Sequence, residues 1–270
     1  MRHVLRPAVL IAALAAAVPA LAAESRPAPV ATSKVPQSGV DAAEINNAKE
    51  YVTCMQLARA KPEDGWEEAL AWESLGGGEP ARHCGAVALI GMGHYEDAAK
   101  RLEDLAADSK RDNLIRARML EQAGQAWLMA GNTDRADAVQ RTALKLVPGL
   151  PDLLLDHAVT LAQVHHYREA KAELDDLLQR QPNRVEGLTL RASARRYLND
   201  LPGARADIDH ALKLDPGFPD ALVERGIIRR LQGDNAGARS DWLKVVKTVP
   251  KGPALDEAQR NLELLDVKTK

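Results

Sequence analysis

Residues 185–218 read VEGLTLRASARRYLNDLPGARADIDHALKLDPGF, and residues 219–252 read PDALVERGIIRRLQGDNAGARSDWLKVVKTVPKG. Aligned without gaps, the two stretches place proline, alanine and small or apolar residues at matching positions. In the second stretch, Gly233-Asp234 is a turn signal, and Pro250 cannot continue a helix. Each stretch therefore predicts two antiparallel helices, which in 219–252 are about Asp220–Gln232 and Ala236–Thr248.

The same register extends over four units, 117–150, 151–184, 185–218 and 219–252. Four independent series of residues recur every 34 positions, which indicates an internal repeat. Small side chains at the eighth and twentieth places of a unit let antiparallel helices approach closely. The series are Pro148, Pro182, Pro216 and Pro250; Ala136, Ala170, Ala204 and Ala238; Gly124, Ala158, Ala192 and Gly226; and Ala143, Leu177, Ala211 and Val245.

This pattern resembles the tetratricopeptide repeat family, whose signature is a bulky fourth residue, a small eighth, alanine at twenty, a small residue at twenty-seven and proline at thirty-two. The unit 185–218 supplies these as Leu188, Ala192, Ala204, Ala211 and Pro216. The resemblance implies an all-α, right-handed α-solenoid of helix-turn-helix repeats with a C-terminal capping helix. It says little about activity, because the signature consists of packing residues.

Outside the four units the register is looser, as is typical of the ends of a solenoid. One further unit fits if four residues are inserted around Ser109–Asn113. Before it, a shorter pair of helices, about Ala42–Ala60 and Trp66–Leu75, is followed by three glycines. The predicted boundaries are 42–78 for the degenerate pair, 79–112 for the further unit and 254–266 for the capping helix, within a solenoid of 42–270.

The first 22 residues have the layout of a secretory signal peptide. Arg2 and Arg6 precede the apolar run Ala8–Val18, and Ala20-Leu21-Ala22 is a small-x-small cleavage pattern. The run is shorter than the ~20 residues that a membrane-spanning helix needs. Residues 23–41 are rich in proline and small polar residues and are predicted to be a flexible linker. We therefore expect a periplasmic or secreted protein of a bacterial-type envelope, cleaved near Ala22 and without a transmembrane segment.

Composition excludes several classes of function. The chain has 270 residues, and its 36 Lys+Arg against 38 Asp+Glu give no basic excess for binding nucleic acid. No phosphate-binding loop, nucleophile elbow or His-Glu-x-x-His motif is present, so we expect a non-catalytic protein without a cofactor. The spacing of Cys54, His83, Cys84 and His94 matches no closed zinc pattern, and no metal site is expected.

Cys54 and Cys84 are predicted to form a disulfide. Each lies on the first helix of its pair, six to eight residues before the expected end of that helix. First helices of successive pairs run side by side in such an array, so the two thiols are expected at the same height. The alternative is two separate buried thiols.

The resemblance also implies a binding surface. In the family, the second, fifth, ninth, twelfth and thirteenth places of the first helix line a concave groove that binds peptides. Here that groove has an apolar middle and a basic, partly aromatic end, which suits apolar anchors and a carboxylate or acidic end; the Lys and Asn clamp of the chaperone-tail type is absent. The groove residues carried over are Gln125, Leu128, Met129, Leu155, Val159, Arg196, Tyr197, Ile227 and Arg230.

We therefore interpret the protein as a scaffold or adaptor that binds a partner peptide or helix of another protein. The alternative function is a cell-wall or polysaccharide-associated accessory protein, which needs exposed aromatic platforms, and only Tyr197 qualifies. An enzyme would need convergent ionisable residues with perturbed pKa values on neighbouring helices. An ordinary solvated groove without a specific ligand is also open.

The seventh and twenty-third places of the units match each other in charge. Arg191 goes with Asp207 and Arg225 with Asp241, whereas 117–150 has Ala123 and Val139 there and 151–184 has His157 and Glu173. Arg195 and Arg229 follow four residues after the first two arginines, and such like-charged neighbours repel unless an acid lies beside them. We hypothesise that the two aspartates bridge these arginine pairs between the helices of one unit; the alternative is that the arginines face the groove and bind an acidic partner.

Overall fold

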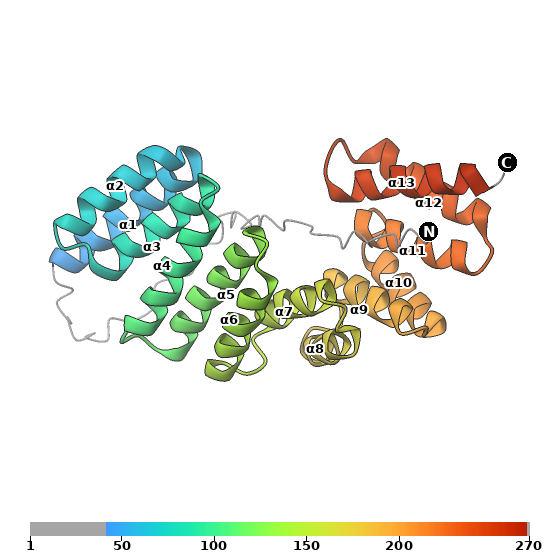
Figure 1. The fold of residues 1–270 in the computed structure, drawn as a ribbon, viewed down its shortest axis with the longest axis horizontal. Coiled ribbons are helices and arrows are strands. Elements are labelled where there is room, and N and C mark those ends of the chain that lie inside the picture. Colours follow the sequence, from blue (N-terminus) through green and yellow to red (C-terminus); the bar gives the residue numbers. More distant parts are fainter. Residues whose placement is uncertain (1–41, 269–270) are drawn as a thin grey trace, which may run out of the picture.

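The computed structural model describes residues 42–268, and this part of the chain consists of α-helices with no strand. The thirteen helices run as an elongated, curved array (Figure 1). Their bounds are α1 Ala42–Ala60, α2 Pro62–Ser74, α3 Gly78–Gly91, α4 Tyr95–Asp108, α5 Asn113–Met129, α6 Thr133–Leu146, α7 Pro151–Gln163, α8 Tyr167–Arg180, α9 Val185–Tyr197, α10 Leu201–Leu214, α11 Pro219–Leu231, α12 Asn235–Thr248 and α13 Pro253–Lys268. The predicted signal peptide and linker, residues 1–22 and 23–41, lie outside the described residues.

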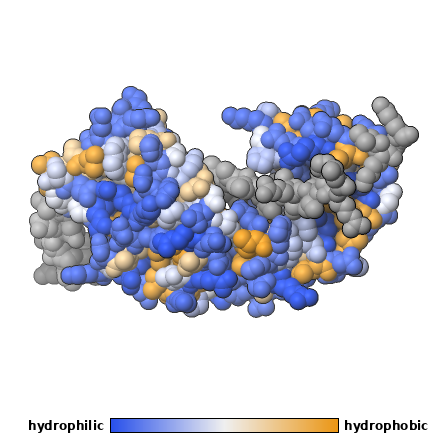
Figure 2. Space-filling model, viewed as in Figure 1, coloured by the Kyte–Doolittle hydropathy of each residue, from blue (hydrophilic) through white to orange (hydrophobic). Residues whose placement is uncertain are grey.

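The helices form six pairs and a final helix, and this confirms the all-α solenoid. Each helix from α2 onward packs against the next, and the first helices α5, α7, α9 and α11 also pack on one another. The second helices α6, α8, α10 and α12 have no comparable mutual contacts. The first helices therefore line the inner side of the curve, which Figure 2 shows as a hollow between the two ends of the molecule. Helix α13 covers the end of the last pair by packing on α11 and α12.

Capping side chains mark the start of four helices. The side chains of Asp112, Asn132, Asp200 and Asp234 accept hydrogen bonds from backbone N–H groups of the first turns of α5, α6, α10 and α12. The helices predicted in 219–252 differ from the observed α11 and α12 by a single residue where they differ at an end.

The four-residue insertion lengthens a helix instead of a loop. The loop 109–112 has the same four-residue length as the loops 147–150, 181–184 and 215–218. Helix α5 has 17 residues, whereas α7, α9 and α11 have 13 each. Four residues are about one helical turn, so the inserted residues form one additional turn at the start of α5.

In each of the four repeats, a small residue on the first helix packs against a larger one on the second. A methyl group added to Gly124 would lie 2.7 Å from Cγ of Gln140, and one added to Gly226 would lie 2.3 Å from Nε1 of Trp242. The two intervening units have alanine at the eighth place and the shorter Leu174 and Ile208 at the twenty-fourth. The eighth place is therefore glycine where the side chain opposite is glutamine or tryptophan.

The tryptophans contribute to packing. Trp72, Trp127 and Trp242 are buried, and Trp66 packs at the edge of the core. The indole N–H of Trp242 donates to the carbonyl oxygen of Val223 at 3.1 Å, which satisfies its polar atom inside the apolar core.

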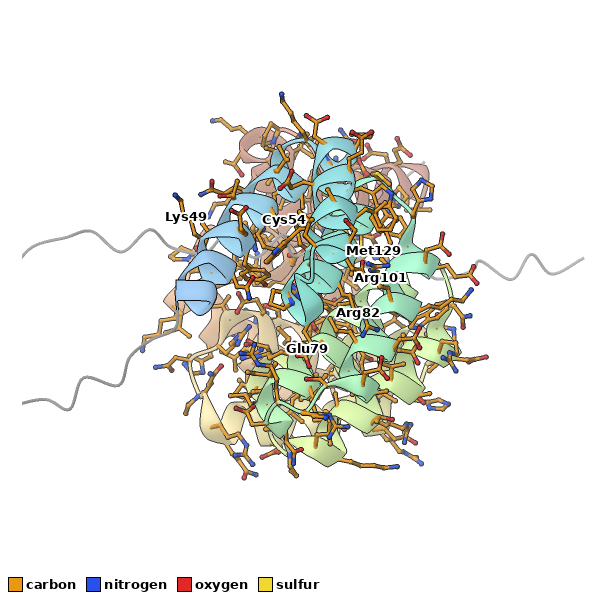
Figure 3. The ribbon with its side chains drawn as sticks, turned by 90° about the vertical axis from the view of Figure 1, so that its left-hand side faces the viewer. Lys49, Cys54, Glu79, Arg82, Arg101 and Met129 are labelled. Carbon is orange, nitrogen blue, oxygen red and sulfur yellow. A yellow bond between two sulfur atoms is a disulfide. The ribbon has the colours of Figure 1, made fainter. Side chains whose placement is uncertain are left out.

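A disulfide joins Cys54 on α1 to Cys84 on α3, as the spacing of the two thiols predicts. The Cα atoms are 6.1 Å apart, and both side chains are buried between the first two helix pairs (Figure 3). His83 is beside it: its Nδ1 lies 2.8 Å from the Tyr51 hydroxyl and its Nε2 lies 2.9 Å from Oε1 of Gln122. These bonds attach the degenerate first pair to α3 and α5.

Candidate functional site: the concave face

The thirteenth place of each repeat is the last residue of the first helix, at one edge of the concave face. Three of the four residues there are large, apolar and exposed: Met129 at 46%, Tyr197 at 40% and Leu231 at 53%. The fourth is Gln163. These four side chains, which we call the place-thirteen row, stand on α5, α7, α9 and α11, one every 34 residues of the chain.

The structure places the other predicted groove residues in different environments. Leu128, Val159 and Ile227 are partly exposed, and Gln125 is exposed. Leu155 is buried in the core with Leu154 and Leu161, so it offers no surface to a partner. The family pattern is therefore wrong for Leu155, because this side chain fills the space between α7 and α8.

Arg196 is not a free cation of the groove. Its Nε lies 2.5 Å and its Nη2 lies 3.1 Å from the two carboxylate oxygens of Glu224, a buried residue of α11. Burial lowers the pKa of Arg196, but the Glu224 carboxylate outweighs that effect and raises it. The expected basic end of the groove is thus reduced, because the charge of Arg196 is already neutralised by the neighbouring repeat.

Tyr197 is part of a stack of side chains. Its ring lies parallel to that of Tyr167 with centroids 4.2 Å apart, and the Arg196 guanidinium carbon lies 4.3 Å from its centroid. The Tyr167 hydroxyl is bonded in turn to Nδ1 of His165 at 2.7 Å. Since the ring of Tyr197 is already in contact with Tyr167 and Arg196, it is no free flat platform for a sugar.

Two buried donors in the groove have no hydrogen-bond partner among the described residues. They are Nε2 of Gln163 on α7 and Nε of Arg230 on α11. Unpaired buried donors are costly, so either side chain would gain a hydrogen bond by turning outward to an acceptor on a partner. Arg230 is therefore the cation of the predicted groove that is available to a partner.

An acidic cluster on α5 and α7 was not predicted. Arg118 pairs with Glu121 at 2.9 Å and with Asp152 at 3.1 Å, and Arg184 pairs with Asp152 at 2.7 Å. Asp156 is different, because its partner is the neutral Nε2 of Gln125 at 2.6 Å. Burial raises the pKa of Asp156 to about 7, and the hydrogen bond from Gln125 only partly offsets this effect.

Acids at the sixth place of a unit explain two of these contacts. Asp156 and Glu224 both occupy that place, and each contacts the preceding first helix, at Gln125 and at Arg196. The sequence contained a signal for these two contacts. It is an acidic residue at the sixth place of a unit, which lies opposite the ninth or twelfth place of the preceding unit.

The charge-matched places seven and twenty-three meet as hypothesised. Arg191 donates through Nε and Nη2 to both oxygens of Asp207, and Arg225 makes the same two bonds to Asp241, at 2.7–2.9 Å. Each aspartate also holds the second arginine of its pair: Nη1 of Arg195 is 2.9 Å from Asp207, and Nη1 of Arg229 is 2.7 Å from Asp241. Asp207 and Asp241 are 5% and 4% exposed. These arginines thus hold helices together and do not face the groove freely.

The same two places in the second repeat hold a histidine. His157 Nδ1 lies 3.1 Å from Oε1 of Glu173, and its Nε2 lies 2.9 Å from Oδ1 of Asp137 on α6. In the first repeat the two places hold Ala123 and Val139, both buried in the apolar core. We call the contact of places seven and twenty-three in each repeat its seam.

Within residues 42–268, no three metal-binding side chains are grouped in a way that could hold an ion, and the two cysteines are used in the disulfide. His83 and His94, considered with them as ligands, do not join such a group. Across the same range, the helices are too short or too polar to cross a bilayer.

Comparison with known proteins gives matches in sequence and in structure. The family model described as "Tetratricopeptide repeat" matches residues 85–151 and 189–253. None of the curated proteins compared with the chain matches it.

Several solved structures are similar in fold. A tetratricopeptide repeat protein from Parabacteroides merdae ATCC 43184 is 17% identical with a TM-score of 0.60, and the match covers 81% of this chain and 85% of that one. MamA, residues 41 to the end, from Desulfovibrio magneticus RS-1 is 22% identical with a TM-score of 0.53, over 60% and 89%. YrrB, described as a TPR protein with an unusual peptide-binding site, is 14% identical with a TM-score of 0.51, over 66% and 93%.

Proposed function

Since this chain belongs to the tetratricopeptide repeat family, we propose that it is a non-catalytic scaffold that binds a segment of another protein along its concave face. The observation that supports this most is the place-thirteen row. Exposed Met129, Tyr197 and Leu231 stand along one edge at the same place of three repeats, which suits apolar side chains of an extended peptide or of a helix.

The polar atoms of the groove indicate which hydrogen-bonding groups the partner contributes besides apolar side chains. The unpaired N–H groups of Gln163 and Arg230 need acceptors, which a peptide provides as backbone carbonyl oxygens and carboxylates. We place the acidic end of the partner segment at Arg230, because Arg196 is occupied by Glu224. The similarity to YrrB, described as having a peptide-binding site, is consistent with this assignment.

We also propose that the protein acts outside the cytoplasm, in the periplasm or after secretion. The support is the signal-like segment of residues 1–22 together with the disulfide between Cys54 and Cys84, since disulfides persist in oxidising compartments. Separating cytoplasmic, periplasmic and culture fractions of cells that produce the full chain, and determining the N-terminus of the product, tests this. A cytoplasmic product with an intact N-terminus would refute it.

Site-specific photocrosslinking tests the binding face. A benzophenone side chain would replace Tyr197 or Leu231 in the row, and Leu243 on α12 in the control, since Leu243 is 50% exposed on a second helix. We expect the two row positions to crosslink to the same discrete protein in cells and the control position to give no such product. Equal products from all three positions would contradict binding at the concave face.

A further inference from the structure

We propose that the seam of α7 and α8 is a pH-responsive joint, in which a protonated His157 holds three helices together and releases one of them when it loses its proton. The ring is on α7, Asp137 is on α6 and Glu173 is on α8. Both ring nitrogens are within 3.1 Å of a carboxylate oxygen, and His157 is only 3% exposed.

The His157 ring must carry a proton on both of its nitrogens, and the reason lies in the chemistry of its two carboxylate partners. Ionised carboxylates only accept hydrogen bonds, and neutral imidazole has one N–H donor. His157 therefore binds Asp137 and Glu173 at once only as the imidazolium. When the ring is neutral, one nitrogen lone pair faces a carboxylate oxygen at hydrogen-bond distance, so one of the two contacts becomes repulsive.

Four helices, α5, α6, α8 and α9, pack on α7. Helix α6 contributes Asp137, which also binds Nε of Arg141 at 2.9 Å, and α8 contributes Glu173. At the same repeat place, α5 has the apolar Ala123, and α9 has Arg191, which is paired with Asp175 and Asp207. Burial lowers the pKa of His157, but the bonds to the two carboxylates outweigh it and raise the pKa above its ordinary value.

Because of where the seam of α7 and α8 lies, deprotonation of His157 would affect both halves of the array. The apolar core is divided here: one cluster extends from Ala86 to Leu153, a small one lies within α7 and α8, and another begins at Leu178. The apolar contacts are divided at α7 and α8. The bonds of His157 therefore make up a larger share of the interactions that hold the two halves of the array together. Loosening this joint would change the spacing of Met129 and Tyr197 on either side of α7.

The sign of the response is set by the raised pKa. His157 stabilises the folded array fully below about pH 6.5, its unfolded value, and the stabilisation is lost as pH rises through the folded pKa. Asp156 also binds its proton more tightly in the folded state, and with a pKa of about 7 its own titration is nearly complete by about pH 8. The two effects are therefore separable above pH 8, or at lower pH in the variant Asp156→Asn.

The first test is an NMR titration of the His157 ring in the protein lacking residues 1–22. We expect both ring nitrogens to be protonated at pH 6 and the midpoint to lie above 6.5. A midpoint at or below 6.5, or a ring with one N–H at pH 6, would overturn the proposal even if no variant can be made.

The second test compares urea unfolding of this protein with that of His157→Arg between pH 7 and 9. The variant reproduces the arginine found at the same place in the next two repeats. In the unsubstituted protein we expect the equilibrium constant for unfolding to rise by up to about tenfold per pH unit until the pH passes the pKa of His157 in the folded state. His157→Arg should lack this rise, and Asp156→Asn, the control, should keep it. The same rise in His157→Arg would contradict the proposed joint.

Discussion

The repeats of α9–α12 and those of α5–α8 share one backbone arrangement but are held by different side chains. In α9–α12, each seam has a buried aspartate that binds two arginines from the facing helix. In α5–α8, one seam is the apolar pair Ala123 and Val139 and the other depends on His157. The difference shows that the repeat specifies positions in space and leaves the chemistry of those positions free. Charge that is permanent in one half is replaced by charge that can be titrated in the other.

The largest expected effect comes from breaking an ionic seam. Asp241→Ala leaves Arg225 and Arg229 partly buried without their carboxylate, and we expect a loss of about 3 kcal/mol in the free energy of urea unfolding. A double-mutant cycle with Arg225→Ala should give a coupling energy above about 1 kcal/mol, beyond the range of a surface pair. The control is the exposed pair Arg205 and Asp209 within α10, whose coupling should be about 0.3–0.5 kcal/mol. Equal coupling in both cycles would contradict a structural role for the buried seam.

Removing the disulfide should have an effect of similar size. The bond closes a loop of 30 residues, which corresponds to roughly 3–4 kcal/mol in the chain-entropy model. We expect Cys54→Ala with Cys84→Ala to increase hydrogen exchange in α1 and α2 and to leave α9–α12 unchanged. Unaltered exchange in α1 and α2 would show that the Tyr51, His83 and Gln122 bonds suffice to hold the first pair.

Replacing Gln140 should stabilise the α5–α8 half. It occupies the twenty-fourth place, where the following repeats have Leu174, Ile208 and Trp242, and both of its side-chain polar atoms are buried without a partner in the described chain. Gln140→Leu should therefore raise the free energy of unfolding by about 1–3 kcal/mol. The reciprocal change Leu174→Gln should lower it. Destabilisation by Gln140→Leu would indicate that the amide is paired by groups such as bound water.

The smallest effect is expected at Asp156. Its partly buried carboxylate has a neutral partner and a pKa of about 7, so at pH 8 the folded state contains a poorly compensated charge. The raised pKa sets an upper limit of about 4 kcal/mol, and because solvent screens the partly exposed carboxylate, Asp156→Asn should raise the free energy of unfolding at pH 8 by only about 1 kcal/mol. At pH 4 the unsubstituted residue is protonated in the folded state, and the gain should disappear. A gain that is the same at both pH values would contradict the titration of this group.

Much of the scaffold could be predicted because its rules are local and repeated. A turn signal and a helix-ending proline fixed α11 and α12 to within one residue, and the matched charges at places seven and twenty-three predicted contacts such as Arg191 with Asp207. The additional turn of α5 was missed, because a polar insertion next to a loop has no apolar spacing that distinguishes helix from coil. Its capping residue, Asp112, was the available signal.

The groove was harder to predict than the scaffold. Leu155 and Arg196 occupy surface places in the family pattern, but one is buried in the core and the other is neutralised by Glu224. The burial of Leu155 depends on the core formed by α7 and α8, and the neutralisation of Arg196 depends on a carboxylate 28 positions away along the chain. The family pattern describes neither how deeply a given place is buried nor the contacts between first helices of different repeats.

The difference between the two halves is tested most directly by hydrogen exchange of the protein lacking residues 1–22 at pH 6.0 and 8.5, corrected for the intrinsic rates. Arginine seams do not titrate in this range, whereas the His157 seam does. We predict that protection falls in α6, α7 and α8 at the higher pH and is unchanged in α9–α12. A uniform change along the array, or loss of protection confined to α9–α12, would contradict the account.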